Sequence, residues 1–497
     1  MKIPDSLLLN NKEHTIFQRL SCLFVIYVFP LVLADVLYKD DISRTLTLSP
    51  TTWYRDGRPL MAFFIKIFSP GMYIPDISPL PLLAGILALA YALACFARKY
   101  LPDLSDWQKV ICTLAFVISP LFLENLSFKF ESFGMCLTLA LFLFLFSLPE
   151  KTSVAENIIA SFLLTMTVLL TYQASIGAFL GLLVLTALLE MENQPVKRVF
   201  LSAFYKVLGF LSSFIIYMLF LVPVFVATDG YQGHVSPRIP NTMEGFHLLI
   251  LNISNCLQFF KKVFLPGFHS PVTWLSAVCL LVVLLYTFSN VYRHIKNSQF
   301  VKALFVFFSP VLIVLFSFLP LCFLKLLIMF PRPFLSFNVF FLLIGIAIVS
   351  LARSYRYIIL LFIPVYLYSF CFMSAYSNLL HTQRQYEEFI AESVAYDLRN
   401  IESIDNSFKF HIDGKIMPSK ELALARRRYS IFNYLIINMY NEFFWFGGDL
   451  VSHYTNFNFI VQKMGKVDYR QYKMVTGNSL YRIMQNGKTV IVDFKQP

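Results

Sequence analysis

Long apolar runs alternate with short polar segments along the first three quarters of the chain. An α-helix needs about 20 mostly apolar residues to cross a bilayer, and about eleven runs come near that length. The predicted spans are 20–37, 79–97, 107–123, 133–148, 158–172, 174–189, 204–227, 274–290, 304–324, 334–351 and 357–377. A further apolar stretch, 63–72, is too short to cross, so we expect it to lie flat on the membrane or to re-enter it. The pattern predicts an all-α polytopic membrane protein.

The last part of the chain, 378–497, has a different pattern. Helical and strand-like segments alternate in it: 383–400 and 420–441 are predicted as helices, and 408–416, 469–475 and 489–494 as strands. Asn486 and Gly487 form a turn pair, and Gly447 with Gly448 predicts a break. About 120 residues suffice for a small domain. We therefore expect a transmembrane domain at 1–377 and a small C-terminal α+β domain at 378–497.

Basic residues gather on alternate loops, which share one side of the membrane. They are Lys2, Lys12, Arg19, Arg98, Lys99, Lys109, Lys197, Arg198, Lys206, Arg293, Lys296, Lys302, Arg353 and Arg356. Such residues favour the cytoplasmic side, so we expect a cytoplasmic N-terminus and, with an odd number of spans, an external C-terminus. The outer loops are then 38–78, 124–132, 228–273 and 325–333.

Composition supports a membrane protein and excludes other classes. The chain is 57% hydrophobic and 14% charged, which is unlike a soluble globule. Its net charge of +12 lies largely in short topology-setting loops, so no nucleic-acid partner is expected. The 8 cysteines lie mostly within apolar runs and form no CxxC pair, which argues against a disulfide framework or a zinc site. The first apolar run lacks a small-x-small cleavage pattern, and we expect a retained signal anchor.

Charged residues are dense in the stretch 38–59 (YKDDISRTLTLSPTTWYRDGRP). Charges beside a membrane are costly unless they pair, coordinate or act. The adjacent Asp40 and Asp41 would point to opposite sides of an extended segment, so only one would face a given site. A carboxylate there can accept a proton from a substrate hydroxyl. The alternative is ordinary solvated loop charge.

Arginines of the outer loops are candidates for binding a phosphate. Arg332 lies between Pro331 and Pro333, which stiffen the backbone around it. A guanidinium at the headgroup level suits a phosphodiester, and an interface anchor is the alternative. Arg58, which also precedes a proline, is the second candidate, and Arg44 is the third.

Two short outer segments supply candidate substrate-binding residues. Glu131 and Lys129 lie in the loop 124–132, and Tyr172 with Gln173 joins two predicted spans. Glu131 also suits a helix N-terminus, Tyr172 also suits an interface anchor, and Glu124 is interpreted as a loop cap or surface charge.

No cofactor is expected from the motifs. The phosphate-cradling patterns GxxxxGK[ST] and GxGxxG are absent. His234, His247 and His269 have no recognised metal spacing, so no metal site is assigned and a divalent metal is not demanded. An outer-face enzyme would then draw its energy from a lipid-linked phosphate in the membrane.

Several of these segments together resemble a known family. They are 9–17 (LNNKEHTIF), 38–44 (YKDDISR), Trp53, 56–60 (DGRPL), 124–132 (ENLSFKFES), 172–175 (YQAS) and 330–332 (FPR). The chain resembles the serotype-converting O-antigen glucosyltransferases of the Gtr type-II family, which are usually borne by phages or prophages. The resemblance is densest before residue 180.

The resemblance implies a GT-C-type glycosyltransferase of the bacterial inner membrane, with its C-terminus in the periplasm. It implies undecaprenyl-phosphate glucose as donor, a lipid-linked O-antigen repeat as acceptor, and a flippase and a carrier-charging glucosyltransferase as functional partners. It also implies that the acidic first loop is catalytic, which falls here on Asp40 and Asp41. The linkage formed does not carry over, because acceptor-determining residues differ among members.

The mechanism we expect is a single displacement that inverts the anomeric configuration. Asp40 or Asp41 takes the proton of an acceptor hydroxyl, and Arg58 and Arg332 stabilise the leaving phosphate. One alternative is a transporter or flippase for a lipid-linked sugar, which would carry ionisable residues inside its spans; these are nearly absent. Another is an O-antigen polymerase or ligase, which would transfer a whole glycan.

Overall fold

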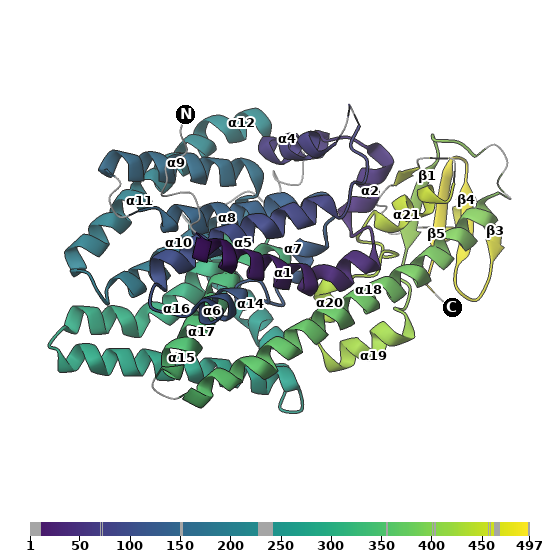
Figure 1. Cartoon of the computed structure of the whole chain (residues 1–497). Helices are drawn as coiled ribbons and strands as arrows, with labels where there is room; N and C mark the ends of the chain where they lie inside the picture. Colours follow the sequence, from purple (N-terminus) through teal and green to yellow (C-terminus); the bar gives the residue numbers. More distant parts are fainter. Residues whose placement is uncertain are drawn as a thin grey trace. The chain divides into compact units, whose positions relative to one another are not determined.

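The computed structural model describes residues 11–69, 71, 73–149, 153–226, 242–353, 356–399, 401, 404–455, 457, 459–461 and 468–495. Helices dominate this part of the chain (Figure 1). Within it, 9 helices are long and apolar enough to cross a membrane: Glu13–Ala34, Leu80–Tyr100, Val154–Thr171, Gln173–Glu190, Val196–Phe225, Pro271–Lys296, Phe300–Cys322, Arg332–Ala352 and Tyr357–Leu398. Two shorter apolar helices are Pro59–Phe68 and Ser132–Ser147. The predicted fold class, a polytopic all-α protein with a small C-terminal α+β region, is confirmed.

The chain forms two compact units. Unit 1 comprises Met1–Phe29, Pro50–Met72 and Ile77–Met373, and unit 2 comprises Pro30–Ser49, Tyr73–Asp76 and Ser374–Pro497. The boundaries fall inside two helices, α1 (Asn11–Ala34) and α18 (Phe362–Leu398). Part of the first outer loop therefore belongs to the same unit as the C-terminal tail. The domain limits predicted above concern membrane insertion and stay a prediction.

Unit 1 is a helical bundle. Its elements are α3 (Thr51–Arg55), α4 (Pro59–Phe68), α5 (Leu80–Tyr100), α6 (Asp106–Leu114), α7 (Leu123–Ser127), α8 (Ser132–Ser147), α9 (Val154–Thr171), η2 (Gln173–Ser175), α10 (Ile176–Glu190), α11 (Val196–Ile216), η3 (Tyr217–Leu221), α12 (Val222–Phe225), α14 (Met243–Phe264), α15 (Pro271–Lys296), α16 (Phe300–Cys322), η4 (Arg332–Phe337), α17 (Asn338–Ala352) and η5 (Arg356–Leu361). The helix α5 packs along α8, and α9 packs along α11 (Figure 1). The helix α17 is buried on nearly all sides, against α6, α10, α15 and α16.

One of the predicted spans of unit 1 is wrong. The predicted span 107–123 is not one helix, because α6 ends after 9 residues and the chain turns through 115–122, which contains Pro120. Its apolar residues are buried inside the bundle, and hydropathy alone does not separate burial in protein from exposure to lipid.

The predicted outer loop 228–273 contains a helix, α14, of 22 residues. Residues 227–241, including His234, lie outside the described residues. The search for long apolar runs missed α14 because its sequence is amphipathic. Its polar Asn252 is buried and donates from Nδ2 to the carbonyls of Cys322 and Leu324, both at 3.0 Å. These carbonyls lie at the C-terminus of α16, where a helix leaves acceptors without intrahelical partners.

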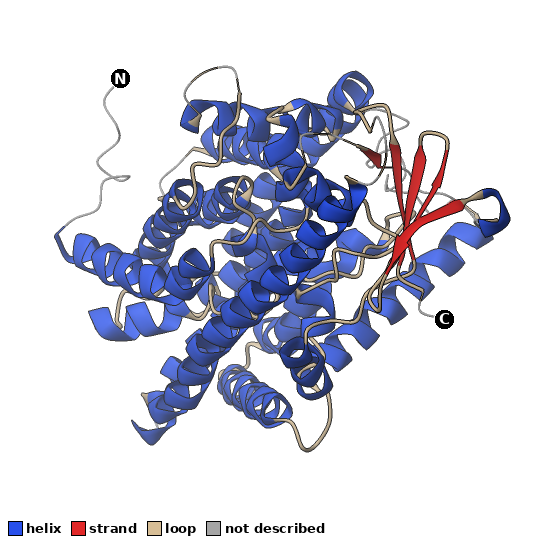
Figure 2. Cartoon of the chain, turned by 90° about the vertical axis from the view of Figure 1, so that its right-hand side faces the viewer, coloured by secondary structure: helices blue, strands red, loops and turns tan. Residues whose placement is uncertain are grey.

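Unit 2 contains a 5-stranded sheet in the order β2-β1-β5-β4-β3 (Figure 2, red). Its strands are β1 (Lys409–Asp413), β2 (Ile460–Val461), β3 (Lys473–Gly477), β4 (Arg482–Asn486) and β5 (Thr489–Asp493). The strand β1 pairs in parallel with β2 and with the central β5, whereas β3 with β4 and β4 with β5 form antiparallel pairs. The other elements are α2 (Asp40–Thr47), α19 (Lys420–Arg428), α20 (Phe432–Leu435), α21 (Phe446–His453) and η6 (Tyr469–Gln471).

Most of the predicted tail elements are found, with three differences. The segment 420–441 is helical only in α19 and α20, and 469–475 begins as η6 before β3. The break predicted at Gly447 and Gly448 is wrong, because both lie inside α21. A Cβ on Gly447 would lie 2.6 Å from Cδ1 of Ile412, and one on Gly448 would lie 2.6 Å from Cγ2 of Val461. These glycines therefore allow α21 to approach the sheet closely.

Candidate functional site

Arg58 of unit 1 lies directly before α4, whose first residue is Pro59. Its Nε donates to Oε1 of Gln173 at 2.9 Å, and its guanidinium lies 5.0 Å from the ring centre of Tyr172. Gln173 in turn donates from Nε2 to the carbonyl of Gly57 at 3.2 Å and to Oη of Tyr217 at 2.8 Å. Three predicted site residues, Arg58, Tyr172 and Gln173, are thus in contact.

Gly57 permits this arrangement. Its φ is +71°, and a Cβ at this position would lie 2.7 Å from Oη of Tyr217. A side chain at position 57 would therefore be strained in its backbone and would push away the tyrosine that supports Gln173. The turn at Gly57 directs Arg58 towards the loop between α9 and α10.

Arg332 is held through its backbone. Its N–H donates to Oε2 of Glu124 at 2.8 Å, and its carbonyl accepts from Nδ2 of Asn125 at 3.2 Å. The guanidinium lies 5.0 Å from the ring centre of Phe128. The prolines on both sides of Arg332 restrict its backbone, and two residues of α7, Glu124 and Asn125, hold that backbone by hydrogen bonds.

Two buried carboxylates balance these cations. Glu124 and Glu131 are each 1% exposed, and Oε1 of Glu131 accepts from the indole Nε1 of Trp53 at 2.8 Å. Burial acts to lower the pKa of Arg58, but Asp56 and Glu131 outweigh it, so the pKa is raised and the side chain stays cationic. Glu124, interpreted from sequence as a loop cap or surface charge, is instead a buried support for Arg332.

Arg58, Arg332, Glu131, Tyr172 and Gln173 together form what we call the guanidinium cluster. The positive charge of Arg332 acts to lower the pKa of both Arg58 and Tyr172, so the two arginines are close enough to interact electrostatically. Burial raises the pKa of the Tyr172 hydroxyl even though Arg332 and Arg58 oppose this, so it stays a neutral donor. The remaining candidate of this region, Lys129, is half-buried in the loop that carries Glu131. Two cations and a phenol so arranged can stabilise a phosphate.

Asp40 and Asp41 lie in unit 2, where they are the first two residues of α2. The extended conformation expected for them is therefore wrong. Lys39, at φ 47°, turns the chain into the helix. The Asp41 side chain is 0% exposed, and its Oδ2 accepts from the N–H of Tyr38 at 3.2 Å. Asp40 is half-buried, so the two carboxylates differ in access.

The segment before Asp40 is fixed by α18. Nη2 of Arg384 donates to the carbonyl of Leu37 at 2.7 Å, and Nδ1 of His381 lies 3.1 Å from the carbonyl of Ala34. Tyr38 donates its hydroxyl to the carbonyl of Leu435. The third arginine candidate, Arg44, is on α2, and thus in unit 2 with the aspartates.

A further carboxylate lies beside α2. Asp449 of α21 accepts a hydrogen bond from Oγ of Ser43, and that Oγ accepts from Nε1 of Trp445 at 3.1 Å. Burial raises the pKa of Asp449 to about 6, with a further rise from Asp40 and an opposing effect of Ser43. We call Asp40, Ser43, Trp445 and Asp449 the aspartate cluster. Sequence reasoning missed Trp445 and Asp449, because no motif or periodicity distinguishes them in the tail.

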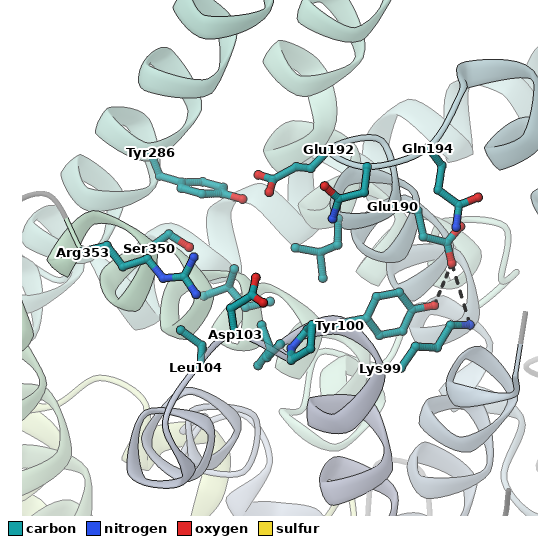
Figure 3. A pocket seen from close by; sticks show the side chains of 15 residues that line it. Lys99, Tyr100, Asp103, Leu104, Glu190, Glu192, Gln194, Tyr286, Ser350 and Arg353 are labelled. Carbon is teal, nitrogen blue, oxygen red and sulfur yellow. Dashed lines mark hydrogen bonds and ion pairs between the residues drawn. The ribbon is translucent and has the colours of Figure 1, made fainter.

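A cavity of about 150 Å³ lies elsewhere in unit 1 (Figure 3). It lies at the carboxyl ends of α5, α10 and α17, whereas Gln173 and Arg332 lie at or before the amino ends of α10 and α17. Figure 3 shows Arg353 and Asp103 pointing toward one another across it. Glu190 accepts from the hydroxyl of Tyr100 at 3.0 Å and lies 3.9 Å from Nζ of Lys99. None of the predicted site residues lines this cavity.

No group of three or more His, Cys, Asp or Glu residues that could hold a metal ion occurs within the part of the chain that the structure describes. His234 lies outside the described residues.

Comparison with known proteins adds a family match. The model of a family described as "Glucosyl transferase GtrII" matches residues 29–351. An "Uncharacterized 55.3 kDa protein in gtrB 5'region" of Salmonella phage P22 is 28% identical over 256 residues, which cover 51% of this chain and 52% of the relative. The chain thus matches about half the length of this curated relative. No solved structure matches.

Proposed function

Because the chain belongs to the GtrII glucosyl transferase family, we propose that it transfers glucose from undecaprenyl-phosphate glucose to a sugar of the lipid-linked O-antigen repeat, in serotype conversion. The observation that carries the proposal is the family match itself. It covers residues 29–351, which include α2 and the whole guanidinium cluster. The polytopic architecture agrees with a donor and an acceptor that are both lipid-linked.

The proposed reaction is one displacement at the anomeric carbon of the donor glucose. The acceptor hydroxyl oxygen forms the new bond to that carbon, and the bond from carbon to the phosphate oxygen breaks. An aspartate accepts the hydroxyl proton, and undecaprenyl phosphate leaves with the bonding electron pair. The configuration at the anomeric carbon is inverted.

We assign the proton to Asp40 in preference to Asp41. Asp41 is 0% exposed and accepts from the backbone of its own turn, which fits a structural role at the start of α2. Asp40 is half-buried on the same turn and is the more accessible carboxylate. A general base must come within hydrogen-bonding distance of the proton it takes.

We assign the phosphate to the guanidinium cluster. Arg58 and Arg332 are stiffly held cations, and the phenol of Tyr172 lies beside Arg58. Charge grows on the phosphate oxygens as the glycosidic bond breaks, and preorganised donors stabilise it without reorganising. Glu131, Gln173 and Lys129 would hold these donors or contact the sugar. No step in this scheme requires a metal ion.

The proposed location is the bacterial inner membrane, with a cytoplasmic N-terminus and a periplasmic C-terminus. The basic loops support this orientation. In such a place the enzyme depends on a carrier-charging glucosyltransferase to load the donor and on a flippase to deliver it.

The test is the structure of the O-antigen glycan in a host strain with and without the protein. We expect one added hexose per repeat, measured by mass spectrometry and by linkage analysis. Altered chain length or altered attachment to lipid A would instead indicate a polymerase or a ligase, and an unchanged glycan in a strain that loads and flips the donor would contradict the proposal.

A further inference from the structure

The interface between α2 and α21 joins residues that are 406 positions apart in the chain. Ser43 of α2 donates to Asp449 and accepts from Trp445, as described above. Two residues further along α2 and four residues further along α21, Oγ1 of Thr45 lies 3.1 Å from Nε2 of His453, and the same nitrogen lies 3.3 Å from the carbonyl of Ile42. Two polar contacts of this kind fix the rotation of α2, and therefore the direction of its first-turn aspartates.

We propose that Asp449 is a positioning residue for Asp40: through its hydrogen bond with Ser43 it fixes α2, and with α2 the direction of the carboxylates in the first turn. The inference rests on the proposed function, because it assumes that Asp40 takes the proton. It gives the C-terminal tail a part in the chemistry.

The charge of Asp449 decides how strongly it holds Ser43. An ionised carboxylate is a stronger acceptor for a hydroxyl than a neutral carboxylic acid, so the hydrogen bond that fixes α2 is strongest when Asp449 is ionised. Burial raises the pKa of Asp449, and the nearby Asp40 adds to this rise. With a pKa of about 6, Asp449 is mostly ionised at neutral pH and loses its charge as the pH falls through 6.

Other charged groups surround α21 and must be separated from this effect. They are Lys39, Asp40, Asp41 and Arg44 in and before α2, His453 on α21, Lys409, His411 and Asp413 on β1, and Arg384 on α18. Of these, Asp40 is the group that raises the pKa of Asp449. Burial lowers the pKa of His453, with Arg384 adding to this effect, so His453 is the main rival for a titration near pH 6.

The experiment measures glucose transfer in membranes that contain the full-length protein, between pH 5 and pH 8. The probes are undecaprenyl-phosphate glucose and a lipid-linked acceptor, and protein levels are matched. For the wild-type protein we expect the rate to fall with an inflection near pH 6. Asp449→Asn keeps an oxygen that can accept from Ser43 but carries no charge. It should be slower at neutral pH by about threefold to tenfold and should lack the inflection near pH 6.

Ser43→Ala should shift the inflection instead of removing it. Ser43 lowers the pKa of Asp449, so its loss should move the inflection to higher pH, by about half a unit to one unit. A merely structural interface would slow both variants and leave the inflection of each where the wild-type protein has it. His453→Gln should keep the inflection, and the matched control Asp405→Asn, an exposed aspartate of the same unit that pairs with Lys488, should match the wild-type profile.

The outcomes are distinct. If wild-type membranes transfer no glucose, the proposed function fails. If they transfer it and Asp449→Asn keeps the wild-type inflection, or His453→Gln removes it, the proposed function stands and the role of Asp449 is overturned. If Asp449→Asn does not accumulate, the direction of the shift in Ser43→Ala decides between the two outcomes.

Discussion

The guanidinium cluster of unit 1 and the aspartate cluster of unit 2 use charge in opposite ways. In the first, the buried Glu124 and Glu131 lie close to Arg58 and Arg332, and the pKa of Arg58 is raised. In the second, burial raises the pKa of Asp449 to about 6, the hydroxyl of Ser43 opposes this rise, and the like charge of Asp40 adds to it. Opposite charges keep each other ionised, whereas like charges make one of them hold its proton more tightly.

This difference has a functional consequence. The guanidinium cluster keeps its charge at any physiological pH, which suits the binding of a phosphate that is always anionic. The aspartate cluster changes its charge near pH 6, which suits proton transfer. The pH dependence of the proposed reaction should therefore originate in unit 2, and its dependence on the donor phosphate should originate in unit 1.

The strongest test of the comparison is Asp40→Asn. The amide cannot accept the proton, so O-antigen glucosylation in cells should fall by about 10²-fold to 10⁴-fold at normal protein levels. Asp41→Asn should lower the amount or thermal stability of the protein more than its specific activity, because Asp41 is buried at the start of α2. Full transfer by both variants would mean that neither carboxylate is the base.

Replacing the arginines should give a smaller effect of a different kind. Arg58→Lys and Arg332→Lys keep the positive charge but lose the planar fork of donors, so kcat/KM for the donor should fall by about tenfold to 100-fold. The pH profile should keep its wild-type shape. Arg353→Lys, at the cavity at the opposite ends of α10 and α17, is the matched control. An equal loss of kcat/KM in Arg353→Lys would contradict the assignment of the donor phosphate to Arg58 and Arg332.

Gly57→Ala should damage unit 1 without touching a charge. The added Cβ meets Oη of Tyr217 at a backbone φ of +71°, which should cost about 1–3 kcal/mol in stability. We expect a lower melting temperature of the purified protein and weaker donor use, because Gln173 loses its support. Gly487→Ala is the control. Gly487 is exposed and also has a positive φ, of 54°, but a Cβ there would meet nothing within 4 Å. The comparison of the two variants therefore separates the effect of steric contact from that of backbone strain.

The smallest effect concerns stability and pH in unit 2. The pKa of Asp449 rises on folding from 3.8 to about 6, so its contribution to stability is greatest below pH 4 and is lost as the pH rises towards 6. Asp449→Asn removes this loss. The melting temperature of the variant, compared with that of the wild-type protein, should therefore increase between pH 4 and pH 7. A change of about 1 kcal/mol in the free energy of unfolding corresponds to a few degrees in melting temperature. A constant difference across this range would show that Asp449 titrates normally.

The local sequence pattern predicted the structure correctly where the structure of a segment depends on that segment alone. Nine of the eleven predicted spans correspond to long apolar helices in the described part of the chain, and the hairpin at Asn486 and Gly487 follows from turn chemistry. It failed where packing overrides local preference. The run at 107–123 is apolar because it is buried, α14 is a helix without an apolar run, and Gly447 with Gly448 serves close packing inside α21.

The sequence by itself determined that this chain enters a membrane and which charged residues are available beside it. Transfer of an apolar segment into lipid depends on that segment alone, and the charges between the apolar segments can be read directly from the sequence. Only the tertiary structure decided which of these charges meet. It brought Arg58 to Gln173 across 115 positions and Ser43 to Asp449 across 406, and it assigned Arg44 to unit 2 and the other two arginines to unit 1. A side chain's electrostatic environment depends on its neighbours in space, and the fold of the whole chain places those neighbours.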